Sequence, residues 1–137
     1  MIKTAGWFFV VLGGVHTALS LGLFAAKHFA SWFSGGLWRS EGGFADMTAA
    51  MAAYWFSLAS FGVPLLVLGL TVLWTLRRGL VPPAFLGWIL LVWTVVNMAV
   101  LLLSPWVLGV AGSVLYLVGV RRANREQRPA VPLEASR

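Results

Sequence analysis

The sequence contains no cysteine, which excludes a disulfide framework, a zinc site with thiolate ligands and a thiol nucleophile. It also contains few charges, since only 10% of the 137 residues are charged and 60% are hydrophobic. A soluble domain usually has about 25% charged residues. Because so short a chain cannot bury this much apolar surface in a water-soluble core, the composition predicts an integral membrane protein.

Charges are absent from three long stretches of the chain. Thr4–Ala26 holds 23 residues, Met47–Leu76 holds 30 with Pro64 inside it, and Gly79–Val120 holds 42. One crossing of the hydrocarbon needs about 20 residues, so the third stretch must cross twice. Ser104-Pro105 is suited to begin the last helix, because serine caps a helix and proline fits its first turn.

These stretches predict an all-α integral membrane four-helix bundle with up-down-up-down order. Its helices are expected at about 4–26, 48–76, 83–103 and 105–120, with an outer loop at 27–46. The first helix is expected to be retained, because the apolar part of a cleaved signal is only about 7–15 residues long. We therefore expect a four-span domain over residues 1–120 and a basic, disordered cytoplasmic tail over 121–137.

The basic residues predict the orientation of the spans. Eight of them fall on the side that holds both termini, and two, Lys27 and Arg39, fall on the other side. Since cytoplasmic segments carry an excess of lysine and arginine, we expect a multi-pass protein of the cell membrane with both termini in the cytoplasm. The net charge of +6 lies beside the apolar runs, which favours the lipid bilayer as the partner and not nucleic acid.

Aromatic residues recur at helical spacing in the outer loop, at Phe29, Trp32 and Phe33, followed by Leu37. This pattern predicts a short helix over residues 28–38 that lies along the outer membrane surface. A loop whose aromatic side chains only touch lipid headgroups explains the pattern nearly as well.

No Asp, Glu, Lys or Arg lies within the four expected spans, so His16 is the ionisable candidate for a functional role there. Lipid offers an imidazole no hydrogen bond, so we expect His16 to point inward with Asn97, Ser57 or Tyr54 nearby. Together with Thr94, which shares a helix face with Asn97, these are the candidate ligand-binding residues. The alternative is that they only join helices by hydrogen bonds.

The sequence shows no recognisable catalytic or metal-binding arrangement. The second histidine, His28, lies 12 residues after His16, roughly 18 Å away along a continuous helix. No carboxylate within the spans completes a metal site, and there is no Ser-His-Asp arrangement or glycine-rich phosphate loop. We therefore expect no metal, no cofactor and no catalytic residue.

Three short motifs carry a resemblance. They are Gly13-Gly14-Val15-His16 in the first span, Tyr54-Trp55-Phe56 at the start of the second, and Pro105 at the start of the last. In this order they are similar to an uncharacterised family of small bacterial four-helix membrane proteins, the domain of unknown function 6463. The resemblance covers residues 1 to about 120 and implies the four-helix fold, but it implies no activity, substrate or site residue.

Three functions remain open. The first is a small binding or accessory protein for a lipophilic molecule or a larger membrane partner, which the uncharged interior favours. The second is a small transporter that works as a homo-oligomer and uses His16. The third is a membrane enzyme with His16 as base, although a second reacting group is not visible.

Overall fold

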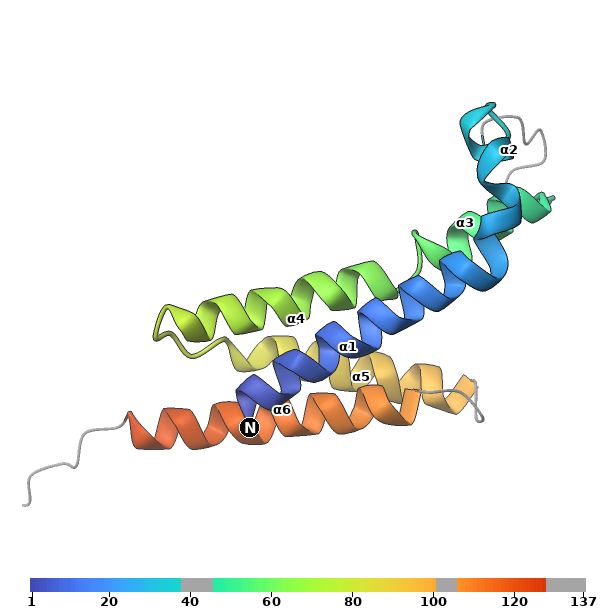
Figure 1. Cartoon of the computed structure of the whole chain (residues 1–137). Coiled ribbons are helices and arrows are strands. Elements are labelled where there is room, and N and C mark those ends of the chain that lie inside the picture. Colours follow the sequence, from blue (N-terminus) through green and yellow to red (C-terminus); the bar gives the residue numbers. More distant parts are fainter. Residues whose placement is uncertain (38–45, 101–105, 128–137) are drawn as a thin grey trace, which may run out of the picture. The chain divides into compact units, whose positions relative to one another are not determined.

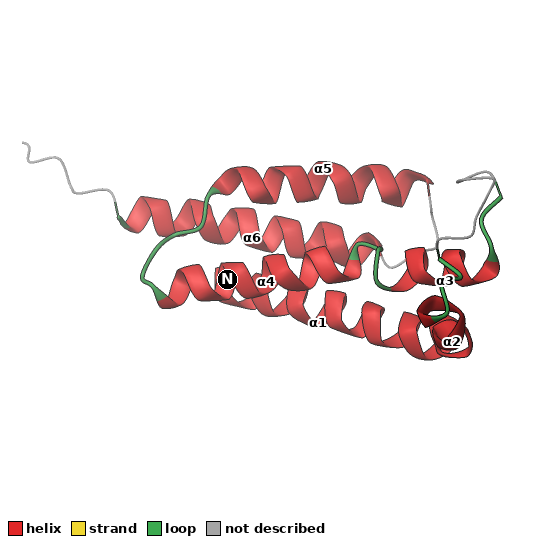
Figure 2. Cartoon of the chain, turned by 90° about the horizontal axis from the view of Figure 1, so that it is seen from above, coloured by secondary structure: helices red, strands yellow, loops and turns green. Residues whose placement is uncertain are grey.

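The computed structural model describes residues 1–37, 46–100 and 106–127. Within these ranges the regular structure is helical and without strands, which confirms the all-α prediction (Figure 2). Figure 1 follows the elements along the chain: α1 (Ile2–Ser20), η1 (Leu21–Ala25), η2 (Ala26–His28), α2 (Phe29–Phe33), α3 (Ala49–Ser57), α4 (Gly62–Arg77), α5 (Ala84–Val100) and α6 (Trp106–Glu126).

Three helical segments are long and apolar enough to cross a membrane, namely residues 2–33, 49–77 and 106–126. Helix α5 is also apolar and has 17 residues, about 26 Å at 1.5 Å per residue. Its expected continuation to residue 103 and the expected break at Ser104-Pro105 lie outside the described residues. By length and composition the chain has the helices of a membrane protein.

The first helical segment continues past its predicted end at residue 26. Helix α1 passes through the π-helical turn η1 and the 3-10 turn η2 directly into α2. The segment ends where Gly35 adopts a positive φ of 87° and Gly36 donates its backbone N–H to the Ser31 carbonyl oxygen at 2.7 Å. The predicted loop at 27–46 therefore begins seven residues too early, because no proline or left-handed residue interrupts the helix before Gly35.

The segment predicted at about 48–76 is present at residues 49–77, but its helix is interrupted. Helix α3 ends at Ser57 and α4 begins at Gly62, with a break at residues 58–61. Pro64 explains the break, because its ring clashes with a helical carbonyl at Ser60 and it has no N–H to donate there. Proline is tolerated at the start of a helix, and Pro64 is the third residue of α4.

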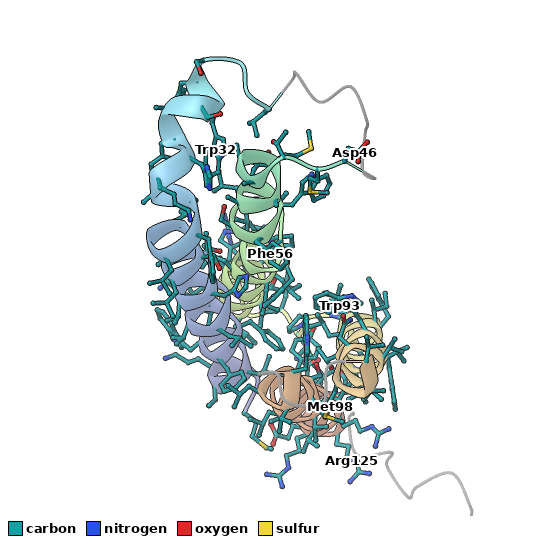
Figure 3. All side chains as sticks on the ribbon, turned by 90° about the vertical axis from the view of Figure 1, so that its right-hand side faces the viewer. Trp32, Asp46, Phe56, Trp93, Met98 and Arg125 are labelled. Carbon is teal, nitrogen blue, oxygen red and sulfur yellow. The ribbon has the colours of Figure 1, made fainter. Side chains whose placement is uncertain are left out.

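The chain divides into two compact units, and Trp7–Leu70 forms one of them. Here α1 and α4 approach so closely that a Cβ on Gly13 would lie 2.5 Å from the Gly62 carbonyl oxygen. At the other end of this unit a small core contains Ala25, Trp32, Ala50 and Ala53. The Trp32 side chain points from α2 toward α3, where its Nε1–H donates to the Ala50 carbonyl oxygen at 2.7 Å (Figure 3).

The same contact revises the expected surface helix at residues 28–38. A helix is present at Phe29–Phe33, but Trp32 is buried while Phe33 is 90% exposed. The expected helix thus forms in part, and its aromatic residues do not share one lipid-facing surface. Trp32 instead fixes α2 against α3.

The second unit contains residues 1–6 and 71–137, and all four helical segments contribute to its described part. Helices α5 and α6 pack side by side (Figures 1 and 2). A Cβ on Gly87 would lie 2.6 Å from the Tyr116 ring, and one on Gly109 would lie 2.7 Å from the Thr94 methyl group. Since an early residue of each helix meets a later residue of the other, α5 and α6 are antiparallel, as the predicted up-down-up-down order requires.

Helix α6 is longer than predicted. It continues from residue 120 to Glu126, which makes it 21 residues and about 32 Å long. Arg121, Arg122 and Arg125 lie in its last turns, where cations interact favourably with the helix dipole. The expected disordered tail therefore does not begin at residue 121, and residues 128–137 lie outside the described part.

Candidate functional site

The break between α3 and α4 is the first candidate site, because it faces His16 on α1. The His16 Nε2 atom lies 3.0 Å from the Ser60 hydroxyl oxygen. The centroid of the imidazole also lies 4.1 Å from that of the Phe61 ring. The break thus exposes backbone and hydroxyl groups that an uninterrupted helix would have used internally.

Ser60 links the imidazole to the end of α3. Its hydroxyl lies 2.9 Å from the Ser57 carbonyl oxygen, and the Gly62 N–H points to the hydroxyl oxygen at 3.4 Å. A hydroxyl has one hydrogen to donate. When that hydrogen goes to Ser57, His16 Nε2 must be the donor to Ser60; when it turns to His16, Nε2 is the acceptor. The arrangement therefore has two hydrogen-bond states that differ in which atom of the pair donates.

The first candidate site contains a buried hydroxyl beside this pair. Thr17 Oγ1 is buried and has no hydrogen-bond partner within the described residues. A Cβ on Gly62 would overlap that oxygen, so Gly62 keeps the space between α1 and α4 open for the Thr17 side chain. An unpaired buried hydroxyl is unfavourable by about 1–3 kcal/mol.

The hydrogen bond that we expected to His16 from Asn97, Ser57 or Tyr54 comes from Ser60. Ser57 is fully buried, and its hydroxyl donates to the Ala53 carbonyl oxygen at 2.6 Å. Tyr54 packs edge-on against Trp32 with ring centroids 5.7 Å apart. Ser60 can reach His16 because Pro64 interrupts the helix at Ser60, so the Ser60 side chain is no longer held in a helical position.

Thr94 and Asn97 belong to the other unit and bond within α5. The Thr94 hydroxyl donates to the Leu90 carbonyl oxygen at 2.8 Å, and the Asn97 Nδ2 donates to the Trp93 carbonyl oxygen at 2.8 Å. Both side chains thereby satisfy hydrogen bonds within their own helix. Thr94 also packs against Gly109 on α6, which supports the alternative that Thr94 joins two helices and does not bind a ligand.

A second candidate site, which sequence reasoning missed, is a groove between the η1–η2 turns and α3. We call it the Lys27 groove. It encloses about 330 Å³ and is lined by Phe24, Lys27, His28, Ala49, Ala52, Ala53 and Phe56. The volume lies at the lower end of the range for small-molecule sites, which is about 300–1,000 Å³.

Local sequence explains how the Lys27 groove forms. On α3, Ala49, Ala52, Ala53 and Phe56 have the i, i+3, i+4, i+7 spacing of one helix face, and the three alanines leave space beside it. On the opposite wall, the π-helical turn η1 holds one residue more than an α-helical turn, and it directly precedes the turn that contains Lys27 and His28. The alanine spacing is visible in the sequence, whereas the π-helical turn has no such signal.

The Lys27 groove combines apolar and basic side chains. Five of its seven lining residues are alanine or phenylalanine, and the other two, Lys27 and His28, are the residues that can carry charge. None of the seven has a carboxylate or a hydroxyl group. These residues therefore offer an apolar surface and two basic groups.

Comparison with known proteins places the chain in a family. No curated protein and no solved structure matches the chain. The sequence model described as "Family of unknown function (DUF6463)" matches residues 1–125, which is nearly the whole chain. The chain therefore belongs to the family of unknown function DUF6463.

Proposed function

We propose that this chain is a small multi-pass membrane protein that binds a lipophilic molecule in the Lys27 groove. The observation that carries the proposal is the mostly apolar groove of about 330 Å³ within the unit Trp7–Leu70. The proposal places the groove within two helical segments that are long and apolar enough to cross a membrane, residues 2–33 and 49–77. A ligand can then reach it from the bilayer.

The proposal includes four spans with both termini in the cytoplasm. Its support is the distribution of basic residues, with Lys3, Arg77, Arg78 and the arginines at the end of α6 at one end of the spans. Lys27 and His28 then lie toward the opposite, outer surface. The apolar part of the groove lies deeper, beside the hydrocarbon.

Steric features of the Lys27 groove support ligand binding over simple helix packing. Helices that pack only for stability close their contacts, as α1 and α4 do at Gly13 and Gly62. Between the η1–η2 turns and α3, by contrast, Phe24 is 57% exposed and Phe56 is 69% exposed on either side of small alanines. An apolar chain seated there would contact both rings and the alanine floor.

The test compares two tryptophan variants. Ala52→Trp fills the Lys27 groove, whereas Ala30→Trp adds the same side chain at an exposed position of α2 that does not line it. The full chain is purified in mild detergent, and bound lipophilic molecules are measured by native mass spectrometry. Wild type and Ala30→Trp should retain a ligand, and Ala52→Trp should lose it.

A second variant protects this test against misfolding. Phe24→Ala removes an exposed wall of the groove and leaves the buried contacts of the unit in place. It should lower ligand retention while circular dichroism and the melting temperature stay close to wild type. Equal retention in wild type, Ala52→Trp and Phe24→Ala would show that the groove is not the binding site.

The broken helix at His16 favours a second candidate function, a small proton-coupled transporter. Transporters often place an interrupted helix at the middle of the membrane, where freed backbone groups contact the transported ion. The His16–Ser60 pair has two hydrogen-bond states at such a break. Proton flux into vesicles, measured with an internal pH dye, should then fall to background in His16→Gln. Equal flux in protein-free, wild-type and His16→Gln vesicles would reject this function.

A further inference from the structure

We infer that the ligand of the Lys27 groove is a phospholipid with a net negative headgroup. This inference rests on the proposed function and adds the chemical class of the ligand. The two lining residues that can carry charge, Lys27 and His28, are both basic, and no acid lines the groove among the residues that the structure describes. An anionic headgroup would supply the negative charge that balances these two residues.

The direction of the groove separates its apolar and basic ends. Trp32 contacts Ala50 while His16 contacts Ser60, so α3 runs antiparallel to the first helical segment. Phe24 and Phe56 therefore lie toward the His16 end, and Lys27 and His28 lie one turn closer to Trp32. An amphiphile fits this order with its chain between the phenylalanines and its headgroup beside the basic residues.

The position of Lys27 beside apolar side chains also bears on the partner of its ammonium group. A cation in an apolar wall is unfavourable unless its charged end reaches water or an anion. Lys27 and His28 both belong to the 3-10 turn η2, so two donors lie at one end of the groove. A headgroup phosphate can accept hydrogen bonds from both, and a headgroup with a net negative charge also balances their positive charge.

The size of the groove indicates how much of the lipid it holds. A volume of about 330 Å³ accommodates a segment of one acyl chain and not a whole phospholipid. The remaining chain would lie in the bilayer. This favours a resident membrane lipid over a soluble ligand, which would need its whole apolar surface covered.

The experiment measures lipid affinity by native mass spectrometry of delipidated full-length protein. The probes are phosphatidylglycerol, phosphatidylcholine with matched chains, and palmitate. Wild type should bind phosphatidylglycerol more tightly than phosphatidylcholine by about fivefold for each basic residue that contacts the headgroup. Lys27→Gln should remove about fivefold of that preference, because phosphatidylglycerol binding should weaken more than phosphatidylcholine binding.

The matched control is Arg78→Gln, a basic residue that contacts the Trp74 ring and does not line the groove. It should keep the preference. Equal affinity of wild type for the two phospholipids would overturn the inference, and so would binding of palmitate alone or an equal loss of both phospholipids in Lys27→Gln. If any of these results were found and Ala52→Trp still abolished lipid binding, the groove would remain the binding site and only the headgroup preference would be rejected.

Discussion

His16 on α1 lies 3.0 Å from the hydroxyl oxygen of Ser60, across the break that separates α3 from α4. The pair joins residues that are 44 positions apart in the sequence. At this contact the imidazole of the first helical segment reaches a hydroxyl group at the helix break that precedes Pro64. Three properties of this region can be tested directly, and the topology can be tested separately.

A double-mutant cycle measures the energy of the pair. His16→Ala, Ser60→Ala and the double variant should give a coupling energy of about 0.6 kcal/mol, the average for hydrogen bonds between membrane helices. Reversible unfolding in mixed detergent supplies the three free-energy differences. A coupling energy near zero would mean that the 3.0 Å contact does not stabilise the fold.

The close approach of α1 and α4 predicts opposite results for two adjacent glycines. A Cβ on Gly13 would lie 2.5 Å from the Gly62 carbonyl oxygen and 2.6 Å from the Leu66 nitrogen, and backbone atoms cannot move aside cheaply. Gly13→Ala should therefore destabilise the chain by about 1–3 kcal/mol. Gly14→Ala meets one atom at 4.0 Å and should be neutral or stabilising. Thermal melts in detergent that showed equal effects would contradict this helix contact.

Pro64 is predicted to cause the helix break. In Pro64→Ala the new backbone N–H can donate to the Ser60 carbonyl oxygen, so α3 and α4 should join into one helix. Hydrogen exchange at residues 58–64 should slow, and the coupling between His16 and Ser60 should weaken because Ser60 returns to the helix. Unchanged exchange in this segment would assign the break to another cause.

The topology can be tested with single cysteines, because the native chain has none. Ser34→Cys and Leu80→Cys introduce thiols at exposed positions that follow the first and second helical segments. Leu80 is preferable to Gly79, whose φ of 72° disfavours a side chain. An impermeant maleimide added to intact cells should label Ser34→Cys and not Leu80→Cys. Labelling of both would reject four spans.

The sequence was sufficient to predict the helical class and the opposite directions of α5 and α6. Both follow from length and the absence of charge, because the uncharged stretch at residues 79–120 is long enough to cross a membrane twice. The break at residues 58–61 was missed although Pro64 was recognised, because proline also occurs within membrane helices when neighbouring groups satisfy the freed carbonyls. Ser60 was therefore placed on the helix and not at its interruption.

The candidate binding groups were harder to predict. His16 was recognised because an imidazole in an apolar span is unusual, whereas Lys27 and His28 read as the normal basic end of a span. Their position in a groove depends on the turns at residues 21–28, which local propensity does not reveal. Asn97 was expected as a partner because it is the only carboxamide in the expected spans and lies at a depth comparable to that of His16. A carboxamide can also bond within its own helix, however, as Asn97 does to Trp93.

The π-helical turn at Leu21–Ala25 has the geometry left by the insertion of one residue into an α-helix. Each residue of an α-helix turns the side chains by about 100° around the axis, so a chain one residue shorter at this turn would present Lys27 and Trp32 to different neighbours. A Cβ on Gly22 would meet no atom within 4 Å, so the turn has space for a side chain at this position. The orientation of one wall of the groove therefore depends on the length of this turn as well as on the residues that line the wall.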